Sequence, residues 1–330
     1  SVSLIIPQGY SQVHLTNLRN LYYWADGSMQ KRATGFEVYG MAANTAGQVL
    51  ASVLNPLQDR GLWSWEPGTE PRHLVSAVSP IKTLTLSPDG ETLASFEDGT
   101  LYSGNLDSMA LMDPTPVPLQ NIRYLRYGPQ GKLWASDPTG LLLLRPETDR
   151  WSRWQDPENQ ARNRIDALLH TSDGDLWIGS DDGVEIRRQD GSLKWIDRID
   201  DTDLQIVTGL AEDGEGRIWL SSGAHWRGAW RWDGERWDFF GPDQGLPAGL
   251  IHRIVPDGRG RLWFLGLHPD APPGHTARHS IVIYQRGSFK PFKIETAREP
   301  GRVYDFAEAP NGDLYFATLN GLVRYRNGAW

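Results

Sequence analysis

One phrase recurs along the chain: a turn centred on glycine, followed by a bulky strand that often carries tryptophan. The anchor residues of its copies are Gly47, Gly90, Gly131, Gly174, Gly216, Gly260 and Gly312. Neighbouring anchors stand 41 to 52 residues apart. A period of this size indicates repeated supersecondary units, each of which buries its faces only against its neighbours. A degenerate further copy opens the chain, because residues 2–29 align without gaps on residues 303–330.

Each copy predicts four short strands. Around Gly174 these are residues 165–170, 176–180, 183–188 and 193–196, separated by turns rich in Gly and Asp. Asp-Gly and Asn-Gly between strand-like runs favour tight hairpins, since both turn residues adopt positive φ. No long helical period interrupts the pattern. Four-stranded units at a period near 40 residues are typical of β-propeller blades.

The sequence therefore predicts an all-β chain with one β-propeller domain covering residues 1–330. Eight blades are expected, at residues 1–34, 35–76, 77–117, 118–156, 157–198, 199–241, 242–295 and 296–330. Seven blades are the alternative, because the last copy ends at Trp330, where its outer strand should begin. In that case residues 2–6 would supply the missing outer strand and close the ring.

The chain contains 15 tryptophans. Trp134, Trp177, Trp219 and Trp263 occupy the same position in successive copies. Large aromatic side chains dominate both cores and binding faces. Because these four recur in register with the repeat, we expect them to pack between neighbouring sheets rather than to bind a ligand.

Composition excludes several classes of function. The net charge is −8 and no run of Lys or Arg forms a basic stripe, so nucleic acid is not an expected partner. The absence of cysteine excludes disulfides and thiolate metal sites. No apolar stretch is long enough to insert into a membrane. The chain begins with Ser1 and shows no signal peptide, which indicates a mature form or part of a longer protein fused to other domains.

Two stretches carry a resemblance to a known family. Residues 243–251 read DQGLPAGLI and are followed by Gly260-Arg261-Leu262-Trp263, while residues 176–180 read LWIGS and precede Gly183-Val184. These phrases resemble the two-component regulator propeller repeat of bacterial proteins. The resemblance implies a sensor propeller, often extracytoplasmic; a cytoplasmic location is the alternative. It transfers no catalytic residue, because this repeat carries fold rather than chemistry.

Two insertions mark the expected site, at residues 221–228 and 266–280. Both follow the Trp strand of adjacent copies, so they should project from one face together with residues 241–250. The candidate binding residues are His225, Trp226, Arg227, His268 and Arg278. An exposed Trp offers a ring face for stacking, and the Arg beside it offers the N–H donors of its guanidinium. This combination suits a sugar, a peptide or an aromatic carboxylate. The alternative is that long polar loops collect His and Pro without a function.

The expected function is a non-catalytic binding module that needs no cofactor and no metal. A scaffold that binds a protein partner is the first alternative. The second is a propeller lyase with a metal at the channel mouth, in which His170 and His252 on inner strands would act. His275 and His279 lie in a Pro/Gly-rich loop rather than on a helix face, and the Asp-Gly-Glu-Gly run at 213–216 lacks the carboxylates of a calcium loop.

Overall fold

The computed structural model is built from antiparallel β-sheets, with two short 3-10 helices in the part that it describes. It describes residues 150–246, 249–267 and 279–294 continuously. In the rest of the chain it describes the strands named below and four single residues, Arg60, Asp98, Thr100 and Thr139. The chain divides into two compact units. The first unit comprises residues 1–154 and 304–330, and the second unit comprises residues 155–303. Among the described residues, no helix has the length and apolar character needed to span a membrane.

The second unit contains three four-stranded sheets, named by their first strands, and each pairs its strands in chain order. The β17 sheet comprises β17 (Ile165–His170), β18 (Leu176–Ser180), β19 (Gly183–Arg187) and β20 (Leu193–Ile196). The β23 sheet comprises β23 (Val207–Glu212), β24 (Ile218–Ser222), β25 (Ala229–Trp232) and β26 (Trp237–Phe240). The β27 sheet comprises β27 (Leu250–Pro256), β28 (Leu262–Leu267), β29 (His279–Gln285) and β30 (Ser288–Pro291).

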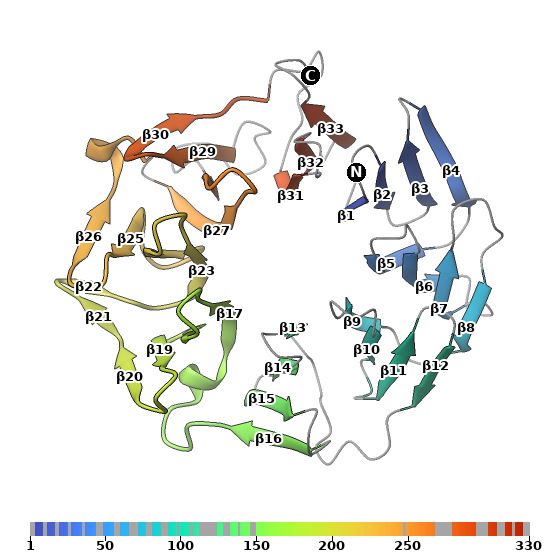
Figure 1. Ribbon diagram of the computed structural model, residues 1–330, viewed down its shortest axis with the longest axis horizontal. Helices are drawn as coiled ribbons and strands as arrows, with labels where there is room; N and C mark the ends of the chain where they lie inside the picture. The colour runs from blue at the N-terminus through green and yellow to red at the C-terminus, as the bar shows by residue number, and fades with distance from the viewer. Residues whose placement is uncertain are drawn as a thin grey trace. The chain divides into compact units, whose positions relative to one another are not determined.

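Neighbouring sheets of this unit lie side by side. Figure 1 shows β17, β23 and β27 on one side of the unit and β20, β26 and β30 on the other. A short hairpin of β21 (Arg198–Ile199) and β22 (Thr202–Asp203) connects the β17 sheet to the β23 sheet. The four strands expected around Gly174 are confirmed, and β19 ends one residue earlier than expected.

The first unit repeats the same topology. Its sheets comprise β1 (Leu4–Gln8), β2 (Gln12–Thr16), β3 (Asn20–Ala25) and β4 (Ser28–Thr34); β5 (Glu37–Ala43), β6 (Val49–Asn55), β7 (Gly61–Trp65) and β8 (Arg72–Ser76); β9 (Ile81–Leu86), β10 (Thr92–Phe96), β11 (Leu101–Asn105) and β12 (Ser108–Leu111); β13 (Tyr124–Tyr127), β14 (Leu133–Asp137), β15 (Gly140–Arg145) and β16 (Arg150–Trp154); and β31 (Val303–Glu308), β32 (Leu314–Thr318) and β33 (Gly321–Tyr325).

The first sheet and the last sheet are neighbours within the first unit, because β1 lies beside β32. Strand β1 pairs with β2, with Leu4 opposite Thr16 and Gln8 opposite Gln12. The alternative in which residues 2–6 complete the last sheet as its outer strand is therefore wrong. Residues 4–6 belong to the first strand of their own sheet, because β1 pairs with β2 from Leu4 to Gln8.

The recurring glycine turn has a simple physical cause. Gly174, Gly216 and Gly260 adopt φ values of +89°, +78° and +71°. In the β23 sheet, the Gly216 amide donates to the carbonyl of Asp213 at 3.0 Å, which closes the turn. A side chain is strained at such a φ, so the turn favours glycine at these three copies.

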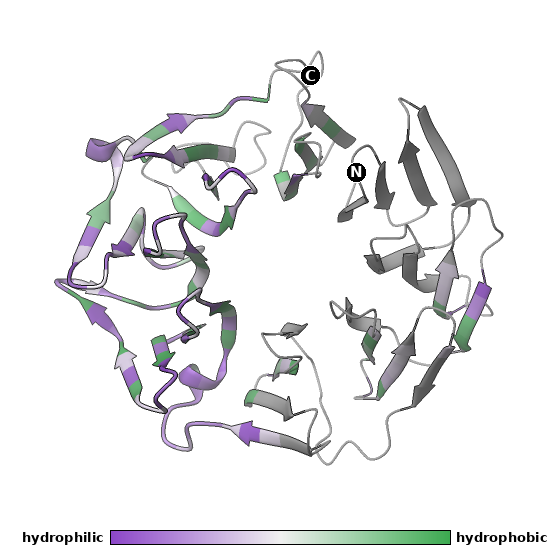
Figure 2. Cartoon of the chain, in the orientation of Figure 1, coloured by the Kyte–Doolittle hydropathy of each residue, from purple (hydrophilic) through white to green (hydrophobic). Residues whose placement is uncertain are grey.

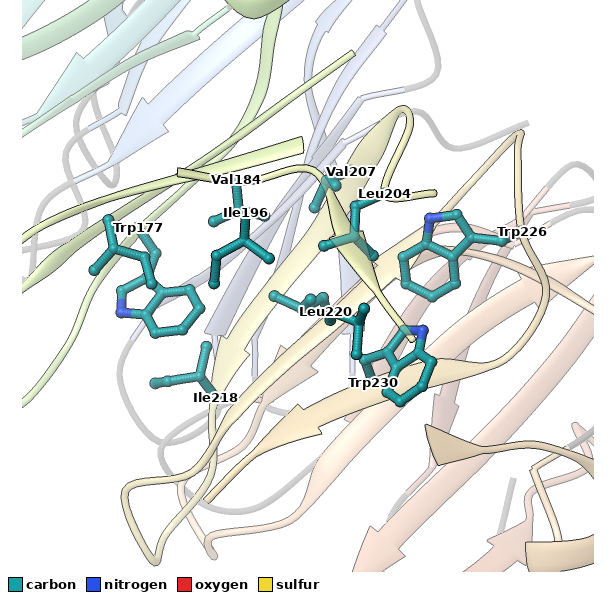
Figure 3. Packing of buried hydrophobic residues seen from close by; sticks show 11 residues of the cluster. Trp177, Val184, Ile196, Leu204, Val207, Ile218, Leu220, Trp226 and Trp230 are labelled. Atoms are coloured by element: carbon teal, nitrogen blue, oxygen red, sulfur yellow. The ribbon is translucent and has the colours of Figure 1, made fainter. Parts of the chain in front are cut away.

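The repeated tryptophans pack between sheets, as expected. Trp177 joins a buried cluster with Ile218 and Leu220 of the next sheet, and Figure 3 shows these side chains facing one another. Trp219 has no exposed surface, and its ring centroid lies 5.3 Å from that of Phe264 and 4.7 Å from that of Tyr284. Burial of such a side chain contributes about 2–3 kcal/mol to folding, so these contacts stabilise the stacked sheets.

Each of two tryptophans is also held by its own turn. The Asp213 carboxylate accepts hydrogen bonds from Trp219 Nε1 at 2.9 Å and from Arg217 Nε at 2.8 Å. Asp257 repeats the arrangement one sheet further on, with Trp263 Nε1 at 2.8 Å. Burial raises the pKa of Asp213, but the hydrogen bonds from Trp219 and Arg217 outweigh this effect and hold the pKa below its ordinary value.

Polar and apolar residues separate along the second unit. Figure 2 shows hydrophobic colours on strands such as β17 and β27 and hydrophilic colours on most of the connecting segments. Among the described residues, the exposed large hydrophobic side chains are Leu193 and Phe239. The segments that join the strands therefore carry most of the polar groups that a partner could meet.

Candidate functional site

The described connections 181–182, 197–206, 223–228 and 241–246 with Gly249 lie at one end of the strands of the second unit, called the loop end below. Because consecutive strands are antiparallel, every second connection returns to the same end. Backbone hydrogen bonds join these segments: the Ile206 amide donates to the carbonyl of Asp181 at 3.2 Å, and the Gly228 amide donates to the carbonyl of Gly249 at 3.3 Å. The connections of three sheets thus form one continuous surface.

Trp226 anchors the insertion at this end. Its side chain is only 7% exposed and belongs to the cluster that contains Leu204 and Val207. Figure 3 shows its indole beside Leu204, on the same side of the cluster as Trp230. The expectation of an exposed Trp is therefore wrong: the insertion folds back, and the large apolar indole gains more from burial against Leu204 than from contact with water.

His225 and Arg227, on either side of this anchor, are both exposed. The backbone amide of His225 donates to Ser222 Oγ at 2.9 Å, and the Ser222 hydroxyl donates to the carbonyl of Gln205 at 3.3 Å. Within the described part of the chain, Arg227 has no ion-pair partner. The buried Trp226 therefore holds a loop that presents an imidazole and an uncompensated guanidinium to solvent.

The insertion ends at a position that only glycine can occupy. Gly228 has a φ of +84°, and a Cβ built on it would lie 2.5 Å from the carbonyl oxygen of Phe240 and 2.8 Å from Phe239 Cζ. A side chain there would collide with strand β26. The glycine therefore lets the exposed loop approach the outer strand of its own sheet closely.

Phe239 is the exposed aromatic side chain at this end, with 42% of its surface accessible. Its ring lies against Gly228, and a Cβ on Gly241 would be 3.0 Å from Phe239 Cε1. On its other side it packs against Trp230, with ring centroids 5.0 Å apart. Phe239 was not among the residues predicted from the sequence, and the signal that could have indicated it is the pair of glycines, Gly228 and Gly241, that flank strands β25 and β26.

Three inner strands share a second feature that the sequence did not indicate. The pairing register shifts around Asp166 in β17, Thr208 in β23 and His252 in β27. Such bulges redirect side chains and are common beside functional sites. A Cβ on Gly223 would lie 3.1 Å from both Thr208 Oγ1 and His252 Cβ, so the start of the insertion sits over these two residues.

The two histidines considered for a lyase site do not meet. His170 pairs opposite Leu176, at the end of β17 that is remote from the loop end. His252 lies two residues into β27, beside Gly223 at the loop end. The register of the sheets therefore separates the two residues. In the part of the chain that the structure describes, no group of three His, Cys, Asp or Glu side chains is placed to hold a metal ion.

The remaining candidate residues belong to the second insertion. His268 and Arg278 lie outside the described residues, as does most of the insertion between β28 and β29. Strand β28 ends at Leu267 and β29 begins at His279, so this insertion leaves and rejoins its sheet at the loop end. One further loop-end residue is strained: Ile206 has a φ of +55°, which is unfavourable for a β-branched side chain.

No family model matches the chain. No curated protein matches its sequence. Solved structures do resemble it. The extracellular domain of the hybrid two component system BT3049 from B. thetaiotaomicron superposes over 99% of this chain with a TM-score of 0.62 at 15% identity. The computationally designed Ika8 protein gives a TM-score of 0.66 at 12% identity, over 98% of this chain and 95% of that one.

The third similar structure is an enzyme. Virginiamycin B lyase from Staphylococcus aureus, crystallised with quinupristin as a catalytically inactive variant, matches 95% of this chain and 97% of its own length, with a TM-score of 0.59 at 14% identity. The present chain spans about half the length of the BT3049 domain, 51%. At these identities the likenesses establish a propeller-like fold of four-stranded antiparallel sheets and leave the activity open.

Proposed function

We propose that this chain is a non-catalytic binding module of the sensor type, which recognises a ligand at the loop end of the second unit. The observation that carries the proposal is the insertion 223–228, in which a buried Trp226 holds His225 and Arg227 in solvent. A rigid anchor with two exposed polar side chains is a common way to display binding groups on a fixed scaffold. The likeness to an extracellular domain of a two-component system supports a sensing role.

We also propose that the sheets form the eight blades of one propeller. Supporting this count, each expected repeat contains one sheet of its own, from β1–β4 at the start to β31–β33 at the end. The side-by-side position of β1 and β32 is the arrangement expected where a ring closes. A crystal structure with seven blades around the axis would contradict this part of the proposal.

The second candidate function is a lyase. It is favoured by the likeness to virginiamycin B lyase and by the bulged positions of Asp166 and His252, a carboxylate and an imidazole that can act in acid–base chemistry. The test is incubation of the chain with quinupristin and a divalent cation, followed by mass spectrometry. Cleavage that is lost in His252→Ala would establish this function in place of the binding role.

A broad, partly apolar face would indicate a protein scaffold. Of the described large hydrophobic side chains, Leu193 and Phe239 are exposed, and they lie on the outer strands of different sheets. The described surface therefore favours a ligand of limited size over a flat protein partner.

The binding proposal is tested by a thermal-shift screen against sugars, amino acids, short peptides, carboxylates and divalent cations. A ligand that binds the native state raises the melting temperature by mass action. The decisive variant is His225→Ala with Arg227→Ala, because it leaves the Trp226 anchor in place. Arg286→Ala is the matched control: Arg286 is also exposed but lies in the β29–β30 turn, at the opposite end of the strands.

A shift that the double variant loses and Arg286→Ala keeps would support the loop end as the site. A shift that survives in the double variant would place the ligand elsewhere. If no compound shifts the melting temperature, the binding role is contradicted for these classes of ligand.

A further inference from the structure

The most informative surface feature outside the predicted residues is the exposed ring of Phe239. Exposed apolar side chains are common when they are isolated and mobile. Phe239 is neither, because one edge lies against Gly228, another lies against Gly241, and the ring packs on Trp230. Its orientation is therefore fixed before any ligand arrives, and a planar group can stack on it at little cost in side-chain entropy.

An arginine that is unpaired among the described residues directly precedes the loop residue that contacts this ring. Gly228, which touches Phe239, is preceded directly by Arg227 in the chain. Many of the described arginines of the second unit form an ion pair with a carboxylate: Arg162, Arg164, Arg187, Arg188, Arg198, Arg217, Arg231, Arg236 and Arg261. Arg227 has no such partner among the described residues, and its guanidinium keeps its donors available for an anion.

The structure of this surface selects a class of ligand. An aromatic ring offers its π-face to another ring at a centroid distance of about 4.5–7 Å. A guanidinium binds a carboxylate through two parallel N–H donors. The net charge of the chain is −8, which disfavours anions in general, so a carboxylate needs a local cation such as Arg227.

We propose that Phe239 and Arg227 form a binding site for an aromatic monocarboxylate, with the ligand ring on Phe239 and its carboxylate on Arg227. This inference rests on the proposed binding function and names its ligand class. It also replaces Trp226 by Phe239 as the stacking group of the loop end.

The test uses 3-phenylpropionate and its neutral amide as probes, with dissociation constants measured by calorimetry on the full chain. The carboxylate is expected to bind and the amide to bind at least tenfold more weakly, because only the carboxylate pairs with Arg227. Phe239→Ala should weaken the carboxylate about three- to tenfold, the range expected for loss of one stacked ring. Arg227→Gln should weaken it about ten- to a hundredfold.

Matched controls distinguish a site from a general surface effect. Leu193→Ala removes the other exposed large hydrophobic side chain, and Arg286→Gln removes another exposed arginine; neither should change the affinity. Phe239→Leu keeps an apolar side chain against Gly228 and removes the ring, so it replaces Phe239→Ala if that variant fails to fold. The peptide Gly-Gly-Phe, with a free or an amidated C-terminus, tests whether a peptide end can supply the same chemistry.

Three results would overturn the inference. The carboxylate could fail to bind, it could bind Phe239→Ala and Arg227→Gln as tightly as the parent chain, or the amide could bind as well as the acid. The proposed function is judged separately: a ligand from the thermal-shift screen that is lost with His225→Ala but retained with Phe239→Ala would keep the loop-end site and reject this ligand class.

Discussion

The Asp213 carboxylate should be one of the most sensitive single groups in the second unit, and Asp213→Ala is the variant that tests this. The side chain of Asp213 is 3% exposed, and it accepts hydrogen bonds from Trp219 Nε1, from Arg217 Nε and from the backbone amides of Glu215 and Arg217. Removal of the carboxylate leaves an indole N–H without a partner in a position that has no access to water.

The expected loss follows from these contacts. An unsatisfied buried donor costs about 1–3 kcal/mol, and removal of one partner from a buried ion pair costs about 3–5 kcal/mol. Arg217 is 19% exposed and keeps its ion pair with Glu215 at 2.6 Å, which discounts the second figure. We therefore expect Asp213→Ala to lower the free energy of unfolding by about 3–4 kcal/mol. Asp213→Asn, which keeps one acceptor oxygen, should cost about half as much.

The assay is urea unfolding, with hydrogen exchange of the β23 and β24 amides as a local readout. The midpoint of unfolding reports a change in stability where the slope is unchanged. Asp257→Ala should reproduce the loss, because Asp257 holds Trp263 and Arg261 in the same way. Asp190→Asn is the control, since this turn aspartate is exposed and should have little effect. A loss below about 1 kcal/mol for Asp213→Ala, or one no larger than that of the control, would refute the reasoning.

The remaining predictions concern the loop end, the ends of the chain and pH. Trp226→Ala should lower the free energy of unfolding, measured in urea, by about 3–5 kcal/mol, because it opens a cavity beside Leu204. A loss no greater than that of His225→Ala would show that the Trp226 side chain is not needed to hold the loop. Gly228→Ala should lower the melting temperature, because its Cβ meets the carbonyl oxygen of Phe240 at 2.5 Å; an unchanged melt would contradict this close approach. Deletion of residues 1–7 removes most of β1 and should lower the melting temperature by several degrees, and an equal melt would show that β1 does not stabilise the first unit. The folded-state pKa values of Asp213 and Asp257 lie below the ordinary value of an aspartate, so the contribution of these carboxylates to stability is complete at neutral pH and is lost as the pH falls through the folded-state pKa. Acid titration of Asp213→Asn should therefore show a smaller loss of stability than that of the parent chain, and an identical profile would exclude this carboxylate as a source.

The fold was predictable because its signals are local. In the copies around Gly174, Gly216 and Gly260, a glycine with positive φ is followed by a bulky strand and a second tight turn, and neighbouring residues alone specify each of these features. The burial of Trp177, Trp219 and Trp263 also followed from sequence, because their common position in the repeat gives them a common environment. The first copy left two possibilities open, because it lacks the recurring phrase; the pairing of β1 with β2 agrees with the prediction that residues 1–34 form a sheet of their own.

The candidate site was only partly predictable. The position of the insertion follows from comparing copies, and the exposure of His225 and Arg227 agrees with their polarity. The burial of Trp226 depends on Leu204, which lies in a different connection and has no sequence signal that links the two. Phe239 and Phe240 are adjacent and identical, yet only Phe239 is exposed, because alternation along β26 sends their rings to opposite faces. Which face stays open depends on the neighbouring sheet.

The contact between Asp213, Arg217 and Trp219 bears on how a repeat protein can gain further repeats by duplication. The acceptor, the cation and the indole all come from one stretch, residues 213–219, so a duplicated copy of that stretch carries its own complete interaction. The corresponding stretch of the β17 sheet differs. Thr171 stands at the position of Asp213 and Asp175 at the position of Arg217, and Asp175 pairs with Arg188 from the next hairpin. A repeat that contains all the residues of its stabilising interaction remains stable when it is duplicated. The connections at the loop end take no part in this interaction, so their sequences can change without its loss.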